Sequence, residues 1–382
     1  MSRNGARPDL LVVGGGVIGL SVGREAARRG LKVLVLDRGE AGRGASWAAA
    51  GMLSPLAEVD VPGPFLDFGI ASLRMYRDWV REIVEEVDAP VEYRECGKIL
   101  LAFSPSDLDG LRKRKRLAER HSIPVTLLDS TGLEREEPAL APALSGGLLL
   151  EDDFRVDNRA LVVALRESAH LGGVEIRTGT EVRTIQIEGD RAAGVVLADG
   201  TGISAGAVLV AAGAWSGELK GMPRPVPVRP VRGQMLSLAP TRPISTRMLE
   251  AADGYLVPRD DGRLLVGATM EEAGFREENT VDGTSRLLAV AHRIAPGLGS
   301  ARVVELWSGL RPASLDGLPI LGPDPDIANL YLATGHFRNG ILLAPSTAAS
   351  LGAAIAGDPI DPLPPEFLPG RMLAHEGSTK SS

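Results

Sequence analysis

A glycine pattern near the start of the chain could bind a dinucleotide. Gly14, Gly16 and Gly19 form a G-x-G-x-x-G motif, and Asp37 ends the apolar run that follows it. In such a motif the first glycine allows a tight turn, the second lets the backbone approach a pyrophosphate, and the third lets a helix pack closely on a strand. The acid would accept hydrogen bonds from ribose hydroxyls and disfavours the 2′-phosphate of NADP, although Arg38 stands directly after it. FAD and NAD both remain open at this point.

The elements around this motif predict a βαβ unit. Leu10–Val13 and Lys32–Leu36 are short apolar runs typical of buried strands. Between them, Leu20–Arg29 has the length of a helix and is followed by Gly30, a common C-terminal stop. This connection makes the two strands parallel and points the free N–H groups of the helix N-terminus at the phosphates. A glycine turn that only packs a helix on a sheet is the alternative interpretation.

A second run of small residues favours FAD over NAD. Residues 44–52 read Gly-Ala-Ser-Trp-Ala-Ala-Ala-Gly-Met, and small side chains let the backbone approach a flat, extended ligand. A nicotinamide enzyme needs no such run directly after the acid. An alanine-rich helical turn is the alternative interpretation. The expected cofactor contacts in this run are Ala45, Ser46, Ala50, Gly51 and Met52.

The later elements predict an α/β fold with a second, antiparallel part. Prolines at 223, 225, 227 and 230 indicate an extended linker over residues 221–230. Beyond it, an Asp261-Gly262 turn between two apolar runs indicates a β-hairpin with Tyr255 and Met270 on its opposing arms. Further helices are expected at Phe65–Val87, Ser106–His121, Asn158–Leu171 and Ile341–Ala356. The parallel sheet is expected to resume with strands at Val174–Arg177, Val182–Ile187, Ala193–Leu197 and Ala207–Ala212.

Composition and charge exclude several classes of function. Over 382 residues, 44% hydrophobic and 24% charged residues are typical of a soluble globular protein with about two domains. The net charge of −7 argues against binding to nucleic acid or anionic membranes. The single Cys96 leaves no disulfide pair and no cysteine cluster for a metal, which favours the cytoplasm. The basic run 112–116 is interpreted as a solvated helix face, with a phosphate-binding patch as the alternative.

Several motifs together resemble the D-amino-acid-oxidase-like FAD-dependent oxidoreductases, and within them the glycine oxidase group of thiamine biosynthesis. The resemblance covers nearly the whole chain. It implies a Rossmann-type, glutathione-reductase-like FAD domain that is discontinuous, a second α+β substrate domain built on an antiparallel sheet, and a homotetramer. The segments that carry it are 12–21, 48–53, 266–270, 309–312 and 334–345. The implied FAD domain comprises residues 1–90, 151–222 and 309–382, and the implied substrate domain comprises residues 91–150 and 223–308.

The resemblance also implies roles for individual residues. Arg311 would pair with the substrate carboxylate, because a planar guanidinium binds a carboxylate in a bidentate fork. Tyr255 would donate its hydroxyl to the same carboxylate, and Met270 would wall the pocket, although a Met at a strand end is often core filler. Arg338 and Glu58 would lie near the substrate, with a solvated surface carboxylate as the alternative for Glu58. The further implied FAD contacts are Val17, Ile18, Val182, Gly213, His336, Phe337, Arg338, Asn339, Gly340, Ile341 and Leu342.

The implied reaction is the oxidation of the Cα–N bond of glycine, or of a small amine or D-amino acid, with dioxygen as the acceptor. The products would be glyoxylate, ammonia and hydrogen peroxide, and the imine would serve thiazole formation in thiamine biosynthesis. FAD would be noncovalent, because relatives that attach flavin use a cysteine and Cys96 lies far from the C-terminal flavin loop. A D-amino-acid dehydrogenase, a sarcosine-oxidase-like enzyme and a non-catalytic flavin-binding subunit are the alternatives. Trp47 is larger than the residue typical of relatives, which leaves its contacts beside the flavin open.

Overall fold

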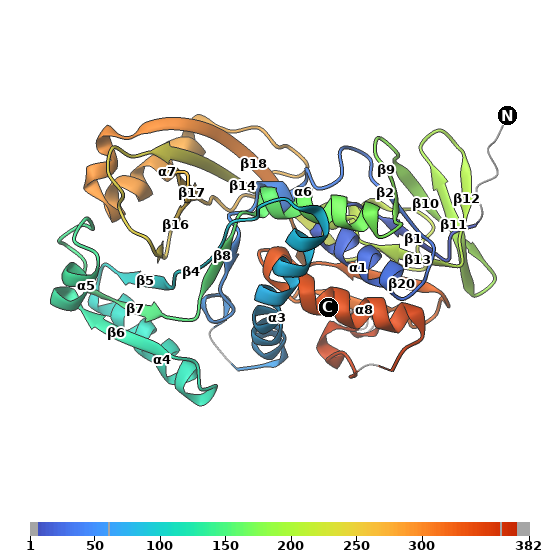
Figure 1. Ribbon diagram of the computed structural model, residues 1–382, viewed down its shortest axis with the longest axis horizontal. Helices are drawn as coiled ribbons and strands as arrows, with labels where there is room; N and C mark the ends of the chain where they lie inside the picture. Colours follow the sequence, from blue (N-terminus) through green and yellow to red (C-terminus); the bar gives the residue numbers. More distant parts are fainter. Residues whose placement is uncertain (1–6, 60–61, 360, 373–382) are drawn as a thin grey trace, which may run out of the picture.

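The chain folds into two groups of elements that lie side by side in the computed structural model (Figure 1). The structure describes residues 7–59, 62–359 and 361–372. One group is built on a six-stranded sheet and the other on an eight-stranded sheet. The predicted fold class, a Rossmann-type α/β part with a second antiparallel part, is confirmed.

The six-stranded sheet has the order β19-β20-β13-β1-β2-β9, and all its neighbours are parallel except β19 and β20. Every residue of β1 and β2 is buried, as expected for strands of a parallel sheet that is covered on both faces. Its strands are β1 (Leu10–Val13), β2 (Val33–Leu36), β9 (Glu175–Arg177), β13 (Ala207–Val210), β19 (Ile320–Pro323) and β20 (Leu330–Thr334).

Alternate residues of β1 face different layers. Leu10 and Val12 pack in one core with the helices α1 (Val17–Arg28), α3 (Pro64–Val87), α6 (Asn158–Leu171) and α8 (Gly340–Ala356). Leu11 and Val13 pack in a second core against a separate three-stranded sheet. That sheet is antiparallel and consists of β10 (Val182–Glu188), β11 (Arg191–Leu197) and β12 (Gly202–Ser204). The expectation that the parallel sheet resumes through 182–197 is therefore wrong, because these strands close on one another as hairpins.

The eight-stranded sheet has the order β18-β14-β17-β16-β15-β5-β7-β6 and is antiparallel except where β5 meets β15. The helix α7 (Val281–Ile294) covers one face, and α4 (Pro105–Arg120) covers the other at the β5-β7 end. A short helix, α5 (Ser130–Glu136), follows β6. The strands are β5 (Lys98–Ala102), β6 (Val125–Asp129), β7 (Gly146–Leu150), β14 (Val228–Ala239), β15 (Met248–Ala251), β16 (Gly254–Pro258), β17 (Leu264–Gly267) and β18 (Arg302–Ser314).

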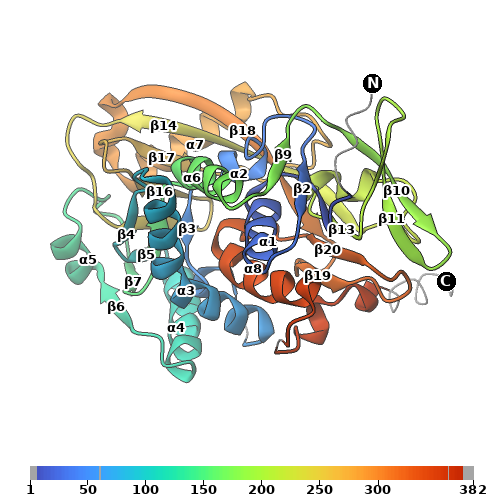
Figure 2. The same cartoon turned by 45° about the vertical axis from the view of Figure 1, so that its right-hand side comes forward.

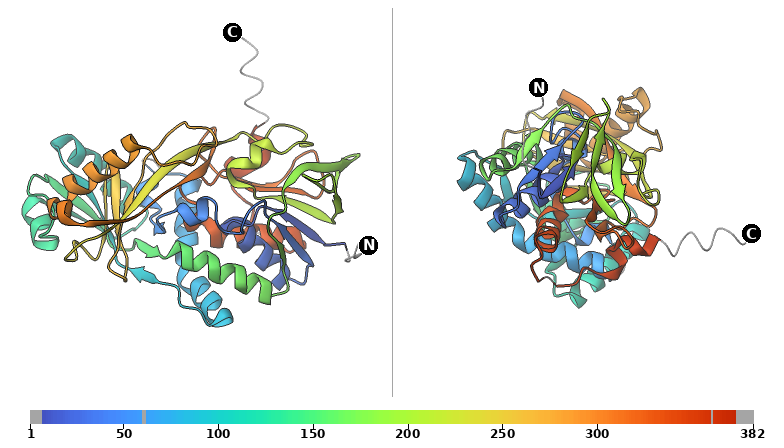
Figure 3. Two further views of the ribbon diagram at one scale, coloured as in Figure 1. Left: turned by 90° about the horizontal axis from the view of Figure 1, so that it is seen from above. Right: turned by 90° about the vertical axis from the view of Figure 1, so that its right-hand side faces the viewer.

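Two long strands, β14 and β18, run from this sheet to the middle of the molecule, as Figure 2 and Figure 3 show. Pro230 lies inside β14, so the expected linker ends earlier than residue 230. A proline fits there because β17 pairs only with Leu236–Leu238, which leaves β14 with a single neighbour at Pro230.

Short elements complete the described chain. A small sheet joins β3 (Met52–Leu53), β8 (Phe154–Val156) and β4 (Tyr93–Glu95) between the two groups. None of the helices in the described ranges combines the length and the apolar content that crossing a bilayer requires. The remaining short helices are α2 (Ala45–Ala48), η1 (Leu56–Glu58), η2 (Gly213–Glu218), η3 (Pro296–Ser300), η4 (Pro365–Phe367) and η5 (Pro369–Met372).

Candidate active site

A cavity of about 1240 Å³ lies where the two groups of elements meet. Its lining comes from the glycine turn, the small-residue run, residues of β14, β16 and β18, and the loop before α8. Ordinary small-molecule sites occupy roughly 300 to 1000 Å³. The cavity is therefore large enough for an extended cofactor together with a small substrate.

The glycine turn forms one end of this cavity. Gly14 has a φ of +107°, and a Cβ at this position would lie 2.4 Å from the carbonyl oxygen of Ala211. A Cβ at Gly19 would lie 2.0 Å from the carbonyl oxygen of Gly14, so helix and turn can pack this closely only with glycine. Gly16 lines the cavity, and a Cβ there would meet only the Ser46 hydroxyl, at 3.4 Å. Gly19 thus allows the helix to pack on the turn, whereas Gly14 and Gly16 line the cavity.

Asp37 lies beside this turn with both carboxylate oxygens held by backbone. Its Oδ2 accepts from the Gly15 N–H at 2.8 Å, and its Oδ1 accepts from the Gly39 N–H at 2.8 Å. Each carboxylate oxygen has a second lone pair, so the fixed acid can still accept from hydroxyl groups of a ligand. The Arg38 side chain turns away from Asp37 and stacks on Trp215, with its guanidinium carbon 3.5 Å from the ring centroid.

The small-residue run is tied to the start of α1. The helix has Gly16 at its N-cap and no side-chain cap, and the Val17 N–H donates to the Ser46 hydroxyl at 2.9 Å. Asn158 donates to the carbonyl oxygens of Ser46 and Trp47, at 2.8 and 3.1 Å. The lining residues from this region include Val17, Ile18, Ala45, Ser46, Ala50, Gly51 and Met52.

Trp47 is turned out of the cavity, although its neighbours in the run line it. Its ring lies 3.6 Å from the guanidinium carbon of Arg43 and 5.1 Å from that of Arg159. The large side chain at position 47 therefore packs against two arginines, and the cavity side of the run is left to small residues.

The loop before α8 closes the cavity from the opposite direction. Its backbone is bent at Phe337, where φ is +48°, and the Phe337 N–H donates to the Pro312 carbonyl at 3.0 Å. His336 is buried beside Thr347, at 3.2 Å, and burial lowers the pKa of the imidazole to about 3. His336 is therefore neutral at physiological pH.

The helix α8 begins at the cavity without a side-chain cap. Asn339 is its N-cap residue, and Gly340 and Ile341 line the cavity, so the helix end whose N–H groups lack intrahelical acceptors lies at the cavity. His336, Phe337, Arg338, Asn339, Val182 and Gly213 also line the cavity. Leu342 does not line it; its side chain lies in the core, and its carbonyl accepts from the Ser72 hydroxyl at 2.7 Å.

Arg311, Tyr255 and Met270 line the cavity around the end of β17, since Arg311 contacts Thr269 and Tyr255 pairs with Gly267. The Arg311 Nη1 donates to the Thr269 carbonyl at 3.1 Å. The guanidinium lies against Gly233 so closely that a Cβ there would be 2.2 Å from Nη1. The Tyr255 ring is buried, with its hydroxyl 3.3 Å from the sulfur of Met235.

Met270 is 60% exposed, so the core-filler interpretation of this residue is wrong. Glu58 ends the short helix η1, but its side chain lies outside what the structure describes. The other expected substrate contact, Arg338, lies with one guanidinium nitrogen 3.9 Å from Glu250.

A buried charged cluster beside this end was not predicted from the sequence. Lys98 is fully buried, donates to the Ser54 hydroxyl at 3.1 Å and pairs with Glu250. Ser54 in turn donates to Asp153, and burial raises the pKa of Asp153 to about 7. Ser54, Glu250 and Arg338 line the cavity, so the cluster forms part of its wall. The one signal in the sequence was a lysine at the head of an apolar strand.

Arg114 also lines the cavity, from the basic run on α4. The solvated-face interpretation holds for Arg112, Lys113 and Arg116, which are exposed. Lys115 is half-buried and pairs with Glu119 on the same helix, whereas the half-buried Arg114 lines the cavity. Within a helix, one residue of a charged run can face inward while those beside it face solvent, and sequence alone does not reveal which one does.

The comparisons with known proteins decide the family. The model of the family described as FAD dependent oxidoreductase matches residues 9–354. The chain belongs to this family. It is 36% identical to a glycine oxidase of Bacillus licheniformis over 355 residues, which cover 93% of this chain and 94% of the relative. It is 39% identical to the bifunctional protein ThiO/ThiG of Synechocystis over 375 residues, and it spans about half of that protein, 54% of its length.

Solved structures of the family share the fold. The crystal structure of glycine oxidase from Geobacillus kaustophilus matches with a TM-score of 0.91 and 32% identity, covering 95% of this chain and 98% of that one. An iminodiacetate oxidase from Chelativorans matches with a TM-score of 0.86 and 27% identity, covering 94% of this chain and 98% of that one.

The cavity fits the cofactor of the family. A Cβ at Gly14 would reach Ala211, one at Gly51 would lie 1.9 Å from the Val156 carbonyl oxygen, and one at Gly309 would lie 2.4 Å from the Ala48 Cβ. At these three lining positions a side chain would collide with neighbouring protein atoms, so the cavity walls there consist of closely packed backbone, which suits an extended ligand. Cys96 packs beside the apolar cluster around Met235 and Met248, and burial raises the pKa of its thiol to about 11. A protonated, half-buried thiol fits noncovalent binding of FAD.

Proposed function

We propose that this chain oxidises the Cα–N bond of glycine or a similarly small amine. Cα loses a hydride, and the Cα–N bond becomes the C=N bond of an imine, which water hydrolyses to glyoxylate and ammonia. When bound, FAD supplies the redox chemistry, accepting the hydride and returning two electrons to dioxygen to give hydrogen peroxide. The observation that carries the proposal is the Arg311 guanidinium, held against Gly233 at the cavity end that also contains Tyr255. The full-length match to proteins named glycine oxidase supports it.

Binding and orientation are the main tasks of the residues at this end. Arg311 would grip the substrate carboxylate in a fork, and Tyr255 would add a hydroxyl donor to the same group. Two such contacts fix the position of Cα, and positioning alone can supply a large part of a rate enhancement. Arg338 and Glu58 would lie near the substrate, and Met270 would wall the pocket.

Charge stabilisation is the second task. The N–H groups at the start of α8, together with the helix dipole, favour negative charge at the cavity. We assign them to the flavin pyrimidine ring, where negative charge develops on reduction. No general base is needed if the amine binds in its neutral form.

We propose further that residues 1–90, 151–222 and 309–382 form the FAD domain and that 91–150 and 223–308 form the substrate domain. The boundary at 309 lies inside β18, so this strand would belong to both. The single cysteine favours the cytoplasm as the place of action. As the family resemblance implies, the chain would act as a homotetramer and supply the imine for thiazole formation in thiamine biosynthesis.

An anaerobic absorbance titration tests the proposed function. Glycine should bleach the visible flavin absorbance of the purified protein, and air should restore it with release of hydrogen peroxide. The Arg311→Ala variant should bind FAD as the parent does but should require far more glycine. Bleaching by larger D-amino acids alone, or a failure to reoxidise in air, would contradict glycine oxidation and favour a dehydrogenase.

A further inference from the structure

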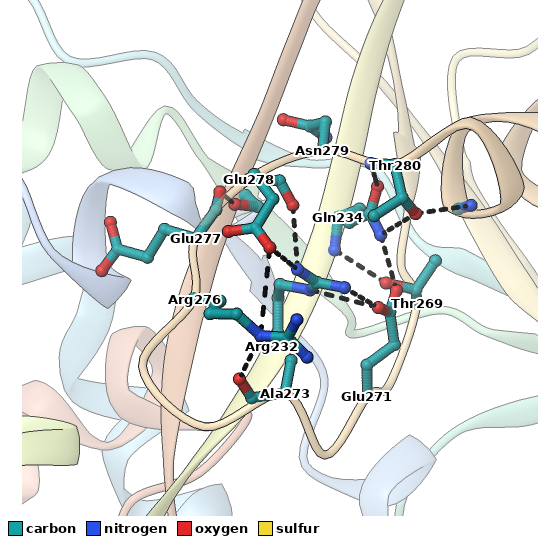
Figure 4. Close-up of polar contacts among 12 residues, drawn as sticks. Arg232, Gln234, Thr269, Glu271, Ala273, Arg276, Glu277, Glu278, Asn279 and Thr280 are labelled. Atoms are coloured by element: carbon teal, nitrogen blue, oxygen red, sulfur yellow. Dashed lines mark hydrogen bonds and ion pairs between the residues drawn. The ribbon is translucent and has the colours of Figure 1, made fainter.

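The segment between β17 and α7 connects the eight-stranded sheet to the cofactor side of the cavity. We call residues 270–280 the strap. It follows β17, which ends at Gly267, and it ends where α7 begins at Val281. Figure 4 shows the strap as an open loop whose two ends, at Glu271 and Thr280, lie beside Arg232 and Gln234 of β14.

Arg232 on β14 holds both ends of the strap. Its Nε donates to the Glu271 carboxylate at 3.1 Å, and its Nη1 donates to the Glu278 carbonyl at 3.1 Å (Figure 4). The backbone pairs as well, since Arg232 and Glu271 exchange N–H···O bonds of 2.9 and 3.0 Å. Arg232 is only 5% exposed, so these are buried, charge-assisted contacts.

Gln234, two residues further along β14, adds a second anchor. Its side chain is fully buried, and its Nε2 donates to Glu271 at 2.7 Å and to the Thr280 hydroxyl at 3.0 Å. Its Oε1 accepts from the Thr280 N–H at 2.8 Å. Because every polar atom of the buried amide is paired, both ends of the strap are fixed. The tip is therefore projected in a defined direction.

The tip of the strap reaches the cofactor side of the cavity. The Phe275 ring stacks on Trp215, with 5.5 Å between the centroids and 28° between the planes. Trp215 belongs to η2, and its ring also packs against the Arg38 guanidinium at 3.5 Å. All three residues line the cavity, and Arg38 directly follows Asp37. The strap is anchored to the eight-stranded sheet, and its tip thus contacts, through Trp215, the loop that follows β2 in the six-stranded sheet.

We propose that Phe275 retains the cofactor: the stack of Phe275, Trp215 and Arg38 closes the cavity beside Asp37 and slows the release of FAD. The 40% exposure of Phe275 agrees with an outer cover, which has solvent on one side and the stack on the other. This inference rests on the part of the proposed function that places FAD along the glycine turn. It does not depend on which amine is oxidised.

The test compares Phe275→Ala with Arg276→Ala. Both residues lie at the tip. The Arg276 side chain is 71% exposed, and its Nε donates to the Ala273 carbonyl at 3.2 Å within the strap, so Arg276→Ala controls for a loss of strap contacts that leaves the Phe275 ring in place. Apoprotein of each variant is titrated with FAD while the free flavin fluorescence is followed, and release is timed after dilution. Loss of one stacked aromatic pair should raise the FAD dissociation constant about two- to tenfold, mainly through faster release. Arg276→Ala should match the parent, and Phe275→Trp should restore retention.

Two outcomes would overturn the inference. One is release of FAD from Phe275→Ala at the parental rate, and the other is equal loosening by Arg276→Ala. Thermal unfolding of each apoprotein checks the fold, and Phe275→Leu, which keeps bulk without a ring, replaces the alanine variant if that variant does not fold. Because FAD binding is measured without substrate, failure of glycine oxidation would leave this test intact.

Discussion

A substitution at Gly233 can displace the Arg311 guanidinium, which we propose binds the substrate carboxylate, without removing the charge of the arginine. In Gly233→Ala the new Cβ would lie 2.2, 2.4 and 2.5 Å from Nη1, Nη2 and Cζ of Arg311. Ordinary van der Waals contact begins at 3.4 Å, so the guanidinium must move by about 1 Å. A misplacement of that size in a positioning group costs roughly 100-fold in rate, or about 2.7 kcal/mol of transition-state stabilisation.

The assay is kcat/KM for glycine, followed by hydrogen peroxide formation. Gly110→Ala on α4 is the matched control, because a Cβ there meets nothing within 4 Å, and its kcat/KM should equal that of the parent. The decisive variant is the double substitution Gly233→Ala with Arg311→Ala. If Gly233 acts only through Arg311, the double variant should be no slower than Arg311→Ala alone. Parental kcat/KM in Gly233→Ala, or a full additional loss in the double variant, would refute this reasoning.

Three further predictions concern stability, each measured by urea unfolding of the apoprotein. Burial lowers the pKa of His336 from 6.5 to about 3, so between these pH values only the unfolded chain gains a proton, and the parent should lose stability as pH falls. The His336→Asn variant should lose less stability than the parent between pH 7 and pH 4. An equal loss would contradict the burial argument. Burial raises the pKa of Asp153 from 3.8 to about 7, so the folded chain keeps a proton between these pH values, and stability falls as pH rises through them. The Asp153→Asn variant should therefore gain stability relative to the parent from pH 5 to pH 8. A difference in unfolding free energy that stays constant over this range would exclude the effect. Gly110→Ala should raise the free energy of unfolding by about 1 kcal/mol through helix propensity, and a decrease would show an unrecognised contact.

The nucleotide-binding end could be predicted from the sequence because its signals are local. The strand Leu10–Val13 was predicted with the bounds that the structure has, and the glycine spacing placed the turn. The helix begins at Val17 rather than Leu20, because Gly19 is part of its first turn and packs on Gly14. Short-range spacing therefore determines this unit almost completely.

The substrate end could not be predicted in the same way, because its contacts join distant segments. Nothing near Lys98 in the sequence indicates that Glu250 will balance its charge inside the protein or that Ser54 will accept its hydrogen bond. Likewise, Gly233 is an unremarkable strand glycine until the register of β14 and β18 places Arg311 beside it. Buried charges and close approaches of this kind depend on strand register, which short-range patterns do not determine.

The strand order of the six-stranded sheet has a consequence for protein synthesis. β1 pairs with β2 early, but its other neighbour, β13, and then β20 and α8 come from much later in the chain. At roughly 5 to 20 residues per second, a ribosome needs about 15 to 65 s to travel from Gly14 to Ile341. The β1 edge of the first βαβ unit stays unpaired until β13 has emerged, and the binding site stays unfinished for the whole of that time. We therefore expect cofactor loading to follow the emergence of α8, and we expect the nascent chain to depend on protection by chaperones until then.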